Sequence, residues 1–170
     1  RNSLMKSFSP TRANIWLFVP LLTVLVLIFY ATAVRDGHNW GGDFSQYILH
    51  AQNLLQGRAY TDLGYVQTTY NPTGPRAYPP GYPVSLVPLL YLFGLNFSAL
   101  KLGVVLFFGI ALSAYWHLAR VNLPLSWALG CMMSLALAPW MLKFSNNLLS
   151  DIPYLAFSLL AVYAAHRFFQ

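Results

Sequence analysis

The chain has 170 residues, of which 57% are hydrophobic and only 8% are charged. A soluble domain carries about 25% charged residues, so this composition excludes a surface that faces water on all sides and predicts an integral membrane protein. The net charge is +6, but the basic residues stand singly beside apolar runs, as topology signals and lipid contacts do. Nucleic-acid binding is not expected, because it needs a basic stripe on one face.

The first apolar run covers residues 15–34, which are 20 residues without a charge. A transmembrane helix needs about 20 residues. The alternative is a cleaved signal peptide, since residues 31–33 are similar to a cleavage site, but a signal core has only about 7–15 residues. Arg1, Lys6 and Arg12 precede the run, so we expect the amino terminus in the cytoplasm.

A polar segment rich in Gly, Tyr and Pro follows, and we expect an external loop over residues 35–96. Within it, apolar residues recur at helical spacing over 43–57, which predicts an amphipathic helix at the membrane interface. Residues 81–93 are apolar but number only 13. They would cover roughly 20 Å of a ~30 Å hydrocarbon core, so we predict a juxtamembrane or re-entrant helix rather than a span.

Three further spans are expected, at 97–119, 125–142 and 152–168. Pro139 is expected to bend the second of these. The whole chain is therefore predicted to be an all-α, multi-pass domain of the cell membrane, with four transmembrane helices and interfacial helices in the first external loop. In this topology every acidic residue lies outside. If residues 81–93 also crossed, Lys143 and Asp151 would turn inward; the length argument favours four spans.

Asp43 is the leading candidate for chemistry. One interpretation is structural, because Asp43 is placed to cap the amphipathic helix and Gln46, three residues later, would complete a capping box. The other is functional: a carboxylate where the loop meets the membrane could take a proton from an acceptor hydroxyl or amine. The two interpretations are compatible, since capping would also hold the carboxylate in place.

Asp151 has a similar pair of interpretations. It is either part of a helix N-cap before Pro153, or a carboxylate that shares a divalent metal cation with a phosphate, as hard oxygen ligands do. His38 and His50 fit no zinc spacing, and we expect both at the surface.

Substrate-binding candidates lie in and around the Pro-rich segment 71–83. Its structural interpretation is an ordered connector with interfacial tyrosines. In the functional interpretation Arg76 binds a phosphate, with Arg58 and Lys143 (and Lys101) as alternative ligands. Tyrosines would then pack against a sugar ring; Tyr47 and Tyr78 are the candidates.

The order of these motifs resembles a known family. Gly-Asp-x-x-x-Tyr at 42–47 opens the amphipathic helix, Tyr-Pro-Pro-Gly-Tyr-Pro at 78–83 opens the short helix, and Phe-Ser-x-x-Leu-Leu-Ser-Asp-x-Pro stands at 144–153. With this spacing, nearly the whole chain resembles the C-type membrane glycosyltransferases, in the group of protein O-mannosyltransferases and aminoarabinose lipid A transferases.

That resemblance implies an inverting transfer of sugar from a polyprenyl-phosphate carrier to a lipid, glycan or protein acceptor outside the cytoplasm. It makes Asp43 the catalytic base and Asp151 the acidic position of the second external loop. Phe44 stands where many relatives carry a second carboxylate. Relatives are also longer, so residues 1–170 are expected to be the amino-terminal part of the domain.

Two other classes of protein are the alternatives. A transporter or lipid flippase would place ionisable residues within the spans, whereas the acidic residues here lie in predicted loops. A non-catalytic membrane scaffold subunit would use Asp43 and Asp151 only as helix caps, so an activity measurement on Asp43 separates it from an enzyme.

Overall fold

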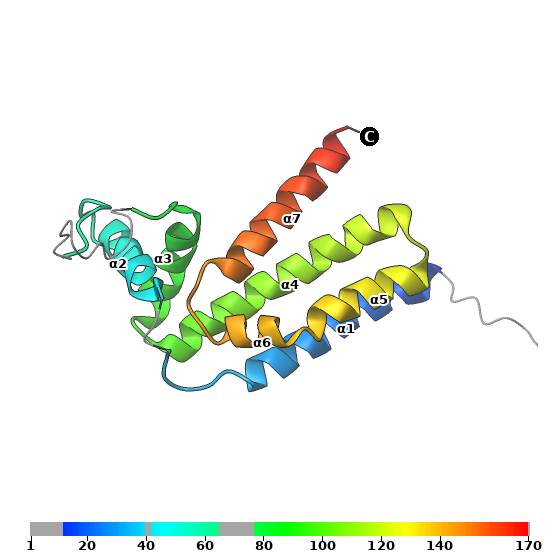
Figure 1. Ribbon diagram of the computed structural model, residues 1–170, viewed down its shortest axis with the longest axis horizontal. Coiled ribbons are helices and arrows are strands. Elements are labelled where there is room, and N and C mark those ends of the chain that lie inside the picture. The colour runs from blue at the N-terminus through cyan, green and yellow to red at the C-terminus, as the bar shows by residue number, and fades with distance from the viewer. Residues whose placement is uncertain (1–11, 40–41, 65–76, 170) are drawn as a thin grey trace, which may run out of the picture.

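The computed structural model describes residues 12–39, 42–64 and 77–169, with side chains from Phe18 onward. The regular secondary structure of that part is all helix, with no strand (Figure 1). Its helices are α1 (Arg12–Thr32), α2 (Phe44–Leu55), α3 (Gly81–Phe93), α4 (Phe97–Asn122), α5 (Leu125–Ala136), α6 (Pro139–Ser145) and α7 (Asp151–Phe168). The predicted all-α class is confirmed, as are the bounds of the short helix at 81–93.

Helix α4 is the centre of the bundle and packs against α1, α3, α5, α6 and α7 (Figure 1). Its buried face includes Leu100, Val104, Phe108 and Leu112. A Cβ at Gly109 of α4 would lie 2.8 Å from Leu27 Cδ1 of α1. The absence of a side chain at this position therefore lets α1 approach α4 closely, as small residues do between membrane helices.

The predicted span at 125–142 is two helices in the structure. Helix α5 ends at Ala136, α6 begins at Pro139, and the pair is bent by 50°. Proline lacks an N–H and disfavours helical geometry in the residue before it, and Ala138 accordingly has ψ 121. The Tyr30 hydroxyl donates to the Ala136 carbonyl at 2.8 Å, which satisfies an acceptor left open at the end of α5.

The number of membrane spans is not confirmed. By length and composition, α4 is the one described helix that could cross a bilayer alone, and α5 with α6 qualifies only as a bent pair. In α1 the segment with described side chains, Phe18–Thr32, is a shorter apolar helix, as is α3. Four spans therefore stay a prediction.

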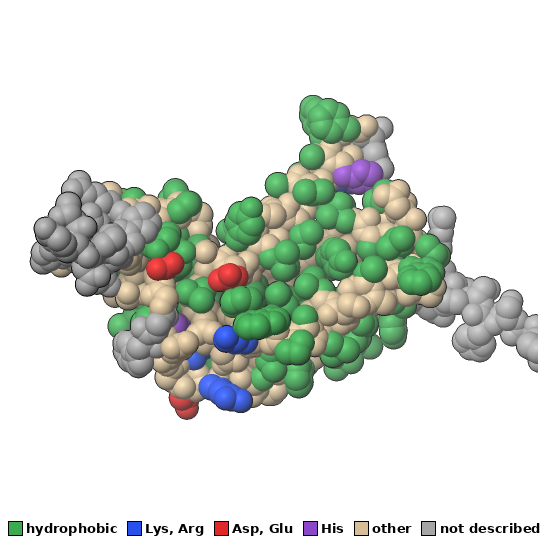
Figure 2. Space-filling view, in the orientation of Figure 1, with side chains coloured by type: hydrophobic (Ala, Val, Ile, Leu, Met, Phe, Trp, Pro, Cys, Tyr) green, Lys and Arg blue, Asp and Glu red, His purple; other side chains and the backbone are tan. Residues whose placement is uncertain are grey.

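Much of the helical surface is apolar (Figure 2). Helix α1 exposes the large side chains Phe18, Leu21, Val24, Leu25, Ile28 and Phe29. Apolar patches of this kind on a folded protein mark contact with another protein or with lipid.

The two predicted loops lie at the same end of the bundle. The end of α1, the starts of α4 and α7, and helices α2, α3 and α6 are gathered there (Figure 1). The start of α1, the α4–α5 connection and the end of α7 lie at the opposite end. The segments that carry Asp43 and Asp151 therefore meet at one end, as the length of α3 led us to expect.

Helix α2 is more enclosed than its pattern indicates. His50 is fully buried and Asn53 nearly so, although both belong to the polar face; the expected surface position of His50 is wrong. The His50 Nδ1 lies 2.7 Å from the Tyr60 carbonyl, and its Nε2 accepts the Tyr78 N–H at 3.3 Å. Asn53 Nδ2 donates to the Asp62 carbonyl at 2.6 Å. The segment after α2 thus covers this polar face and satisfies its hydrogen bonds.

Candidate functional site

The connections after α1 and after α6 are joined through the Asn146 side chain. Its Oδ1 accepts the Arg35 N–H at 2.8 Å, and its Nδ2 donates to the Ala33 carbonyl at 3.2 Å. Further along, a Cβ at Gly42 would lie 3.4 Å from a methyl group of Leu149. Gly42 has φ +86, a conformation that favours glycine. The backbone that presents Asp43 is therefore set beside the second connection.

His38 forms the next link between the two connections. Its Nε2 accepts the Leu148 N–H at 2.8 Å, and its Nδ1 lies 2.6 Å from the Asn39 carbonyl. These partners require a neutral ring with the proton on Nδ1. The ring also stacks on Phe44, with centroids 4.1 Å apart. His38 is therefore partly buried and bonded to the second connection, and no spacing in the sequence signals this link.

Asp43 stands at the N-cap of α2 but does not cap it through its side chain. Burial raises the pKa of Tyr78 most, and hydrogen bonding to the half-buried Asp43 carboxylate and its negative charge raise it further. Capping is therefore not the whole role of Asp43. The Asp43 carboxylate therefore lies beside the Tyr78 hydroxyl at this end of the bundle.

Tyr47 connects the two acidic segments. Its hydroxyl lies 3.0 Å from Ser150 Oγ, and Ser150 makes no capping hydrogen bond to α7. Burial raises the pKa of Tyr47 most, the Ser150 bond lowers it, and the charges of Asp43 and Asp151 both raise it. Both carboxylates are thus close enough to influence one hydroxyl. The Tyr47 ring is only 6% exposed, which leaves little surface on which a sugar could pack as predicted.

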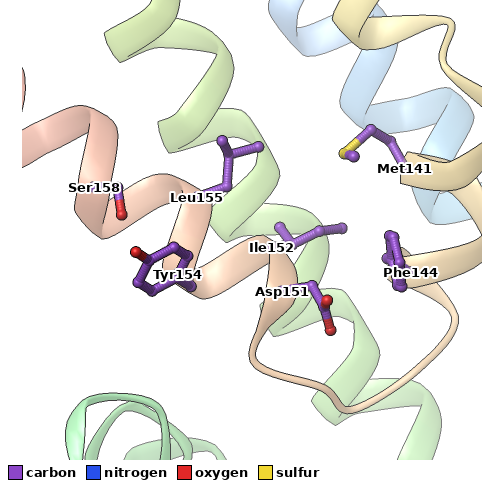
Figure 3. A pocket seen from close by; sticks show the side chains of 7 residues that line it. All are labelled: Met141, Phe144, Asp151, Ile152, Tyr154, Leu155 and Ser158. Carbon is purple, nitrogen blue, oxygen red and sulfur yellow. The ribbon is translucent and has the colours of Figure 1, made fainter.

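Asp151 lies at an open, mostly apolar pocket of about 310 Å³ between α6 and α7 (Figure 3). The other lining residues are Met141, Phe144, Ile152, Tyr154, Leu155 and Ser158. Asp151 is exposed and begins α7. The pocket can therefore offer one carboxylate to a polar group and an apolar wall to the chain attached to it.

Lys143 lines a different pocket. This second space, of about 860 Å³, lies where the end of α1, the start of α4 and α6 meet, and Arg35 and Lys101 line it as well. The Lys143 ammonium lies 4.5 Å from the centroid of the Trp140 ring. Lys143 and Asp151, both predicted to act on a phosphate, thus line separate pockets.

The other predicted binding residues are Arg58 and Arg76. Arg58 is exposed just beyond the end of α2, about 18 Å along the helix from Asp43, so the structure does not bring it to the carboxylates. Arg76 lies outside the described residues. In the described part of the chain no three His, Cys, Asp or Glu side chains form a metal-binding group, and a metal ligand at Asp151 stays a prediction.

Comparisons with protein-family models, with curated proteins and with solved structures found no match. The resemblance to C-type glycosyltransferases therefore stays a prediction from the motifs. The chemistry of the site follows from its residues: two carboxylates from segments distant in sequence, a tyrosine between them and an apolar pocket beside one of them.

The His38 link makes a pH dependence that can be measured. Burial lowers the pKa of His38, as does the Lys101 charge, and the bond to Asn39 opposes them. Because the folded pKa lies below the ordinary value of about 6.5, the link contributes stability above that pH, and the contribution is lost as the pH falls through the folded pKa. We expect the free energy of unfolding to fall between about pH 7 and pH 5, and less so in His38→Phe. His117→Gln, at the other end of α4, should behave like the wild type; equal slopes in all three proteins would contradict this role.

Proposed function

We propose that this chain belongs to an integral membrane glycosyltransferase that moves a sugar from a polyprenyl-phosphate carrier to a lipid, glycan or protein acceptor at the external membrane face. The observation that carries the proposal is the 3.0 Å contact between the Tyr47 hydroxyl, on the helix that Asp43 precedes, and Ser150, the residue before Asp151. Neither Asp43 nor Ser150 makes a side-chain cap. Helix capping therefore does not account for the polar residues gathered at this end.

The proposed topology has four spans, formed by α1, α4, the bent pair α5 and α6, and α7. The exposed apolar face of α1 would contact lipid, and α2 and α3 would lie at the external surface. Arg120 and Arg167 lie near the ends of α4 and α7, at the end of the bundle that holds the start of α1. The basic residues that precede the first apolar run favour a cytoplasmic position for this end.

In the proposed reaction an acceptor hydroxyl or amine attacks the anomeric carbon of the sugar. The bond from that carbon to the phosphate oxygen breaks, and polyprenyl phosphate leaves with the electron pair, so the anomeric configuration inverts. Asp43 takes the proton lost by the acceptor. The Tyr78 hydroxyl lies close enough to Asp43 for the carboxylate to raise its pKa, and a hydrogen bond from it would orient the carboxylate toward the acceptor. Sugar transfer by the full-length protein, compared with Asp43→Asn, tests this directly.

The pocket beside Asp151 suits the lipid part of the carrier. Its walls are mostly apolar side chains of α6 and α7, and Asp151 is the charged residue among them (Figure 3). A divalent cation, when bound, would neutralise charge on the departing phosphate. Asp151 is the exposed carboxylate that would hold it, since such cations take one or two protein carboxylates together with phosphate oxygens.

The charged residues of the described helices support an enzyme over a transporter. Lys101 is the buried cation of α4, and it lies near the start of the helix, where it donates to the Arg35 carbonyl at 2.7 Å. A translocation path would need charged groups near the middle of the spans. The charges are instead concentrated at the ends.

The proposed topology predicts which positions are open to an impermeant thiol reagent. In a Cys131→Ala background, Lys143→Cys should react in intact cells, and Arg120→Cys only after permeabilisation, because these exposed positions lie on opposite sides of the membrane. Each protein is labelled, purified and quantified. Reaction of Lys143→Cys only after permeabilisation would place Asp151 in the cytoplasm and refute the shared external site.

A further inference from the structure

The pocket of about 860 Å³ beside α1 and α6 is cationic. Arg35, Lys101 and Lys143 line it, against one carboxylate, that of Asp36. Arg35 and Lys143 are exposed, and neither forms an ion pair within the described part of the chain. Their charges are therefore open to an anionic ligand.

The wall of this pocket is fixed by a buried lysine. Lys101 is 1% exposed, and its ammonium donates to the carbonyls of Arg35 and Gly37. Asp36, the opposing carboxylate, accepts a hydrogen bond from the Ser98 hydroxyl at 3.0 Å. The connection after α1 is thus held in place, and with it the backbone that carries Arg35.

Apolar surface leads away from the same pocket. Trp140 is 60% exposed and Leu137 is 67% exposed at the α5–α6 bend, and Phe29 of α1 is 55% exposed. Lys143 lies over the Trp140 ring, and Trp and Lys side chains are typical of the membrane interface. Figure 2 shows Lys and Arg side chains beside hydrophobic surface on this face of the molecule. A matching ligand carries a phosphate and hydrocarbon chains together.

We propose that this cationic pocket binds the phosphate headgroup of an anionic membrane phospholipid, whose acyl chains lie on the apolar faces of α1 and α6. Arg35 and Lys143 would contact the phosphate, because charge-assisted hydrogen bonds to phosphate are strong. The site is separate from the pocket beside Asp151. The inference rests on the membrane setting of the proposed function and is independent of sugar transfer.

The test is phospholipid binding by the full-length protein purified in a neutral detergent. Phosphatidylglycerol should bind more tightly than phosphatidylcholine when both are titrated and bound lipid is counted by native mass spectrometry. Arg35→Gln and Lys143→Gln should each weaken phosphatidylglycerol binding about fivefold. Arg120→Gln and Arg167→Gln remove the same charge at the other end of the bundle and should bind it as the wild type does. Unfolding midpoints without lipid show whether each variant is folded.

Several outcomes would overturn the inference. If the folded Arg35→Gln, Lys143→Gln double variant bound phosphatidylglycerol with wild-type affinity, the proposed site would be refuted. Equal binding of glycerol phosphate would show a site for a free anion and not for a lipid. If the protein transferred sugar but bound phosphatidylglycerol and phosphatidylcholine equally, the lipid site would be refuted and the proposed enzyme would not. Lipid binding at this pocket without any sugar transfer would support it and count only against the proposed enzyme.

Discussion

Replacement of Asp43 by Asn in the full-length protein is expected to lower kcat/KM for sugar transfer about 10²–10⁴-fold, the usual contribution of a general base. An amide cannot take the proton that the acceptor loses. The fold should be unaffected, because the Asp43 side chain makes no capping hydrogen bond and Asn is as good an N-cap residue as Asp. The measurement is transfer from a polyprenyl-phosphate sugar at subsaturating donor, with the unfolding midpoint as the check on folding.

The matched control is Asp62→Asn. Asp62 is exposed after α2, and its described hydrogen bonds are made by its backbone: the carbonyl accepts from Asn53 and the N–H donates to the Ala59 carbonyl. This variant loses the same charge and should transfer at the wild-type rate. Asp151→Asn should reduce transfer without abolishing proton removal. A larger loss of transfer in Asp151→Asn than in Asp43→Asn would indicate that Asp151, and not Asp43, is the base. Wild-type turnover by Asp43→Asn would refute the proposed base.

Most of the helices could be predicted from the sequence, because each apolar run has flanking polar or proline residues. The bounds of α3 agree with the prediction at both ends, and its 13 residues correctly indicated that the aspartate segments meet at one end of the bundle. The break between α5 and α6 was visible only as a bend at Pro139. The sequence did not show that the chain leaves helical geometry at Ala138. The break leaves the Ala136 carbonyl without a helical partner. The Tyr30 hydroxyl of α1 donates a hydrogen bond to that carbonyl.

The sequence was enough to predict which acidic residues belong to the candidate site, but not which side chains they contact. Asp43 and Asp151 stand out as acidic residues in an apolar chain, and topology placed them together. Their tyrosine partners depend on tertiary packing: Tyr78 reaches Asp43 only because the segment after α2 folds back over His50. Periodicity also assigned His50 to an exposed polar face, since it cannot show which polar side chains a later segment will satisfy.

Lys101→Met is expected to destabilise the protein by about 2 kcal/mol and to impair transfer. Hydrogen bonds to charged groups contribute about 1.5–3 kcal/mol each, and Lys101 donates to the carbonyls of Arg35 and Gly37. Removal of a buried charge offsets part of this loss, because its desolvation cost disappears as well. Methionine keeps the apolar length of the stem, so the effect reports the ammonium and not a cavity. Unfolding in a denaturant titration gives the stability, and the transfer assay gives the activity.

Lys143→Met separates this role from a general loss of charge. Lys143 lines the same pocket but is exposed, so its replacement should change stability by less than about 0.5 kcal/mol. The effect of Lys101→Met on transfer would act through the connection after α1. Without the lysine, the Gly37 carbonyl loses its hydrogen bond, and the adjacent His38 would no longer hold the Leu148 N–H. The backbone that presents Asp43 would then lose its support. A transfer rate that falls in Lys101→Met and recovers when the His38 link is stabilised at higher pH would identify this route. Equal stability losses in the two lysine variants would show instead that the buried ammonium does not hold the connection.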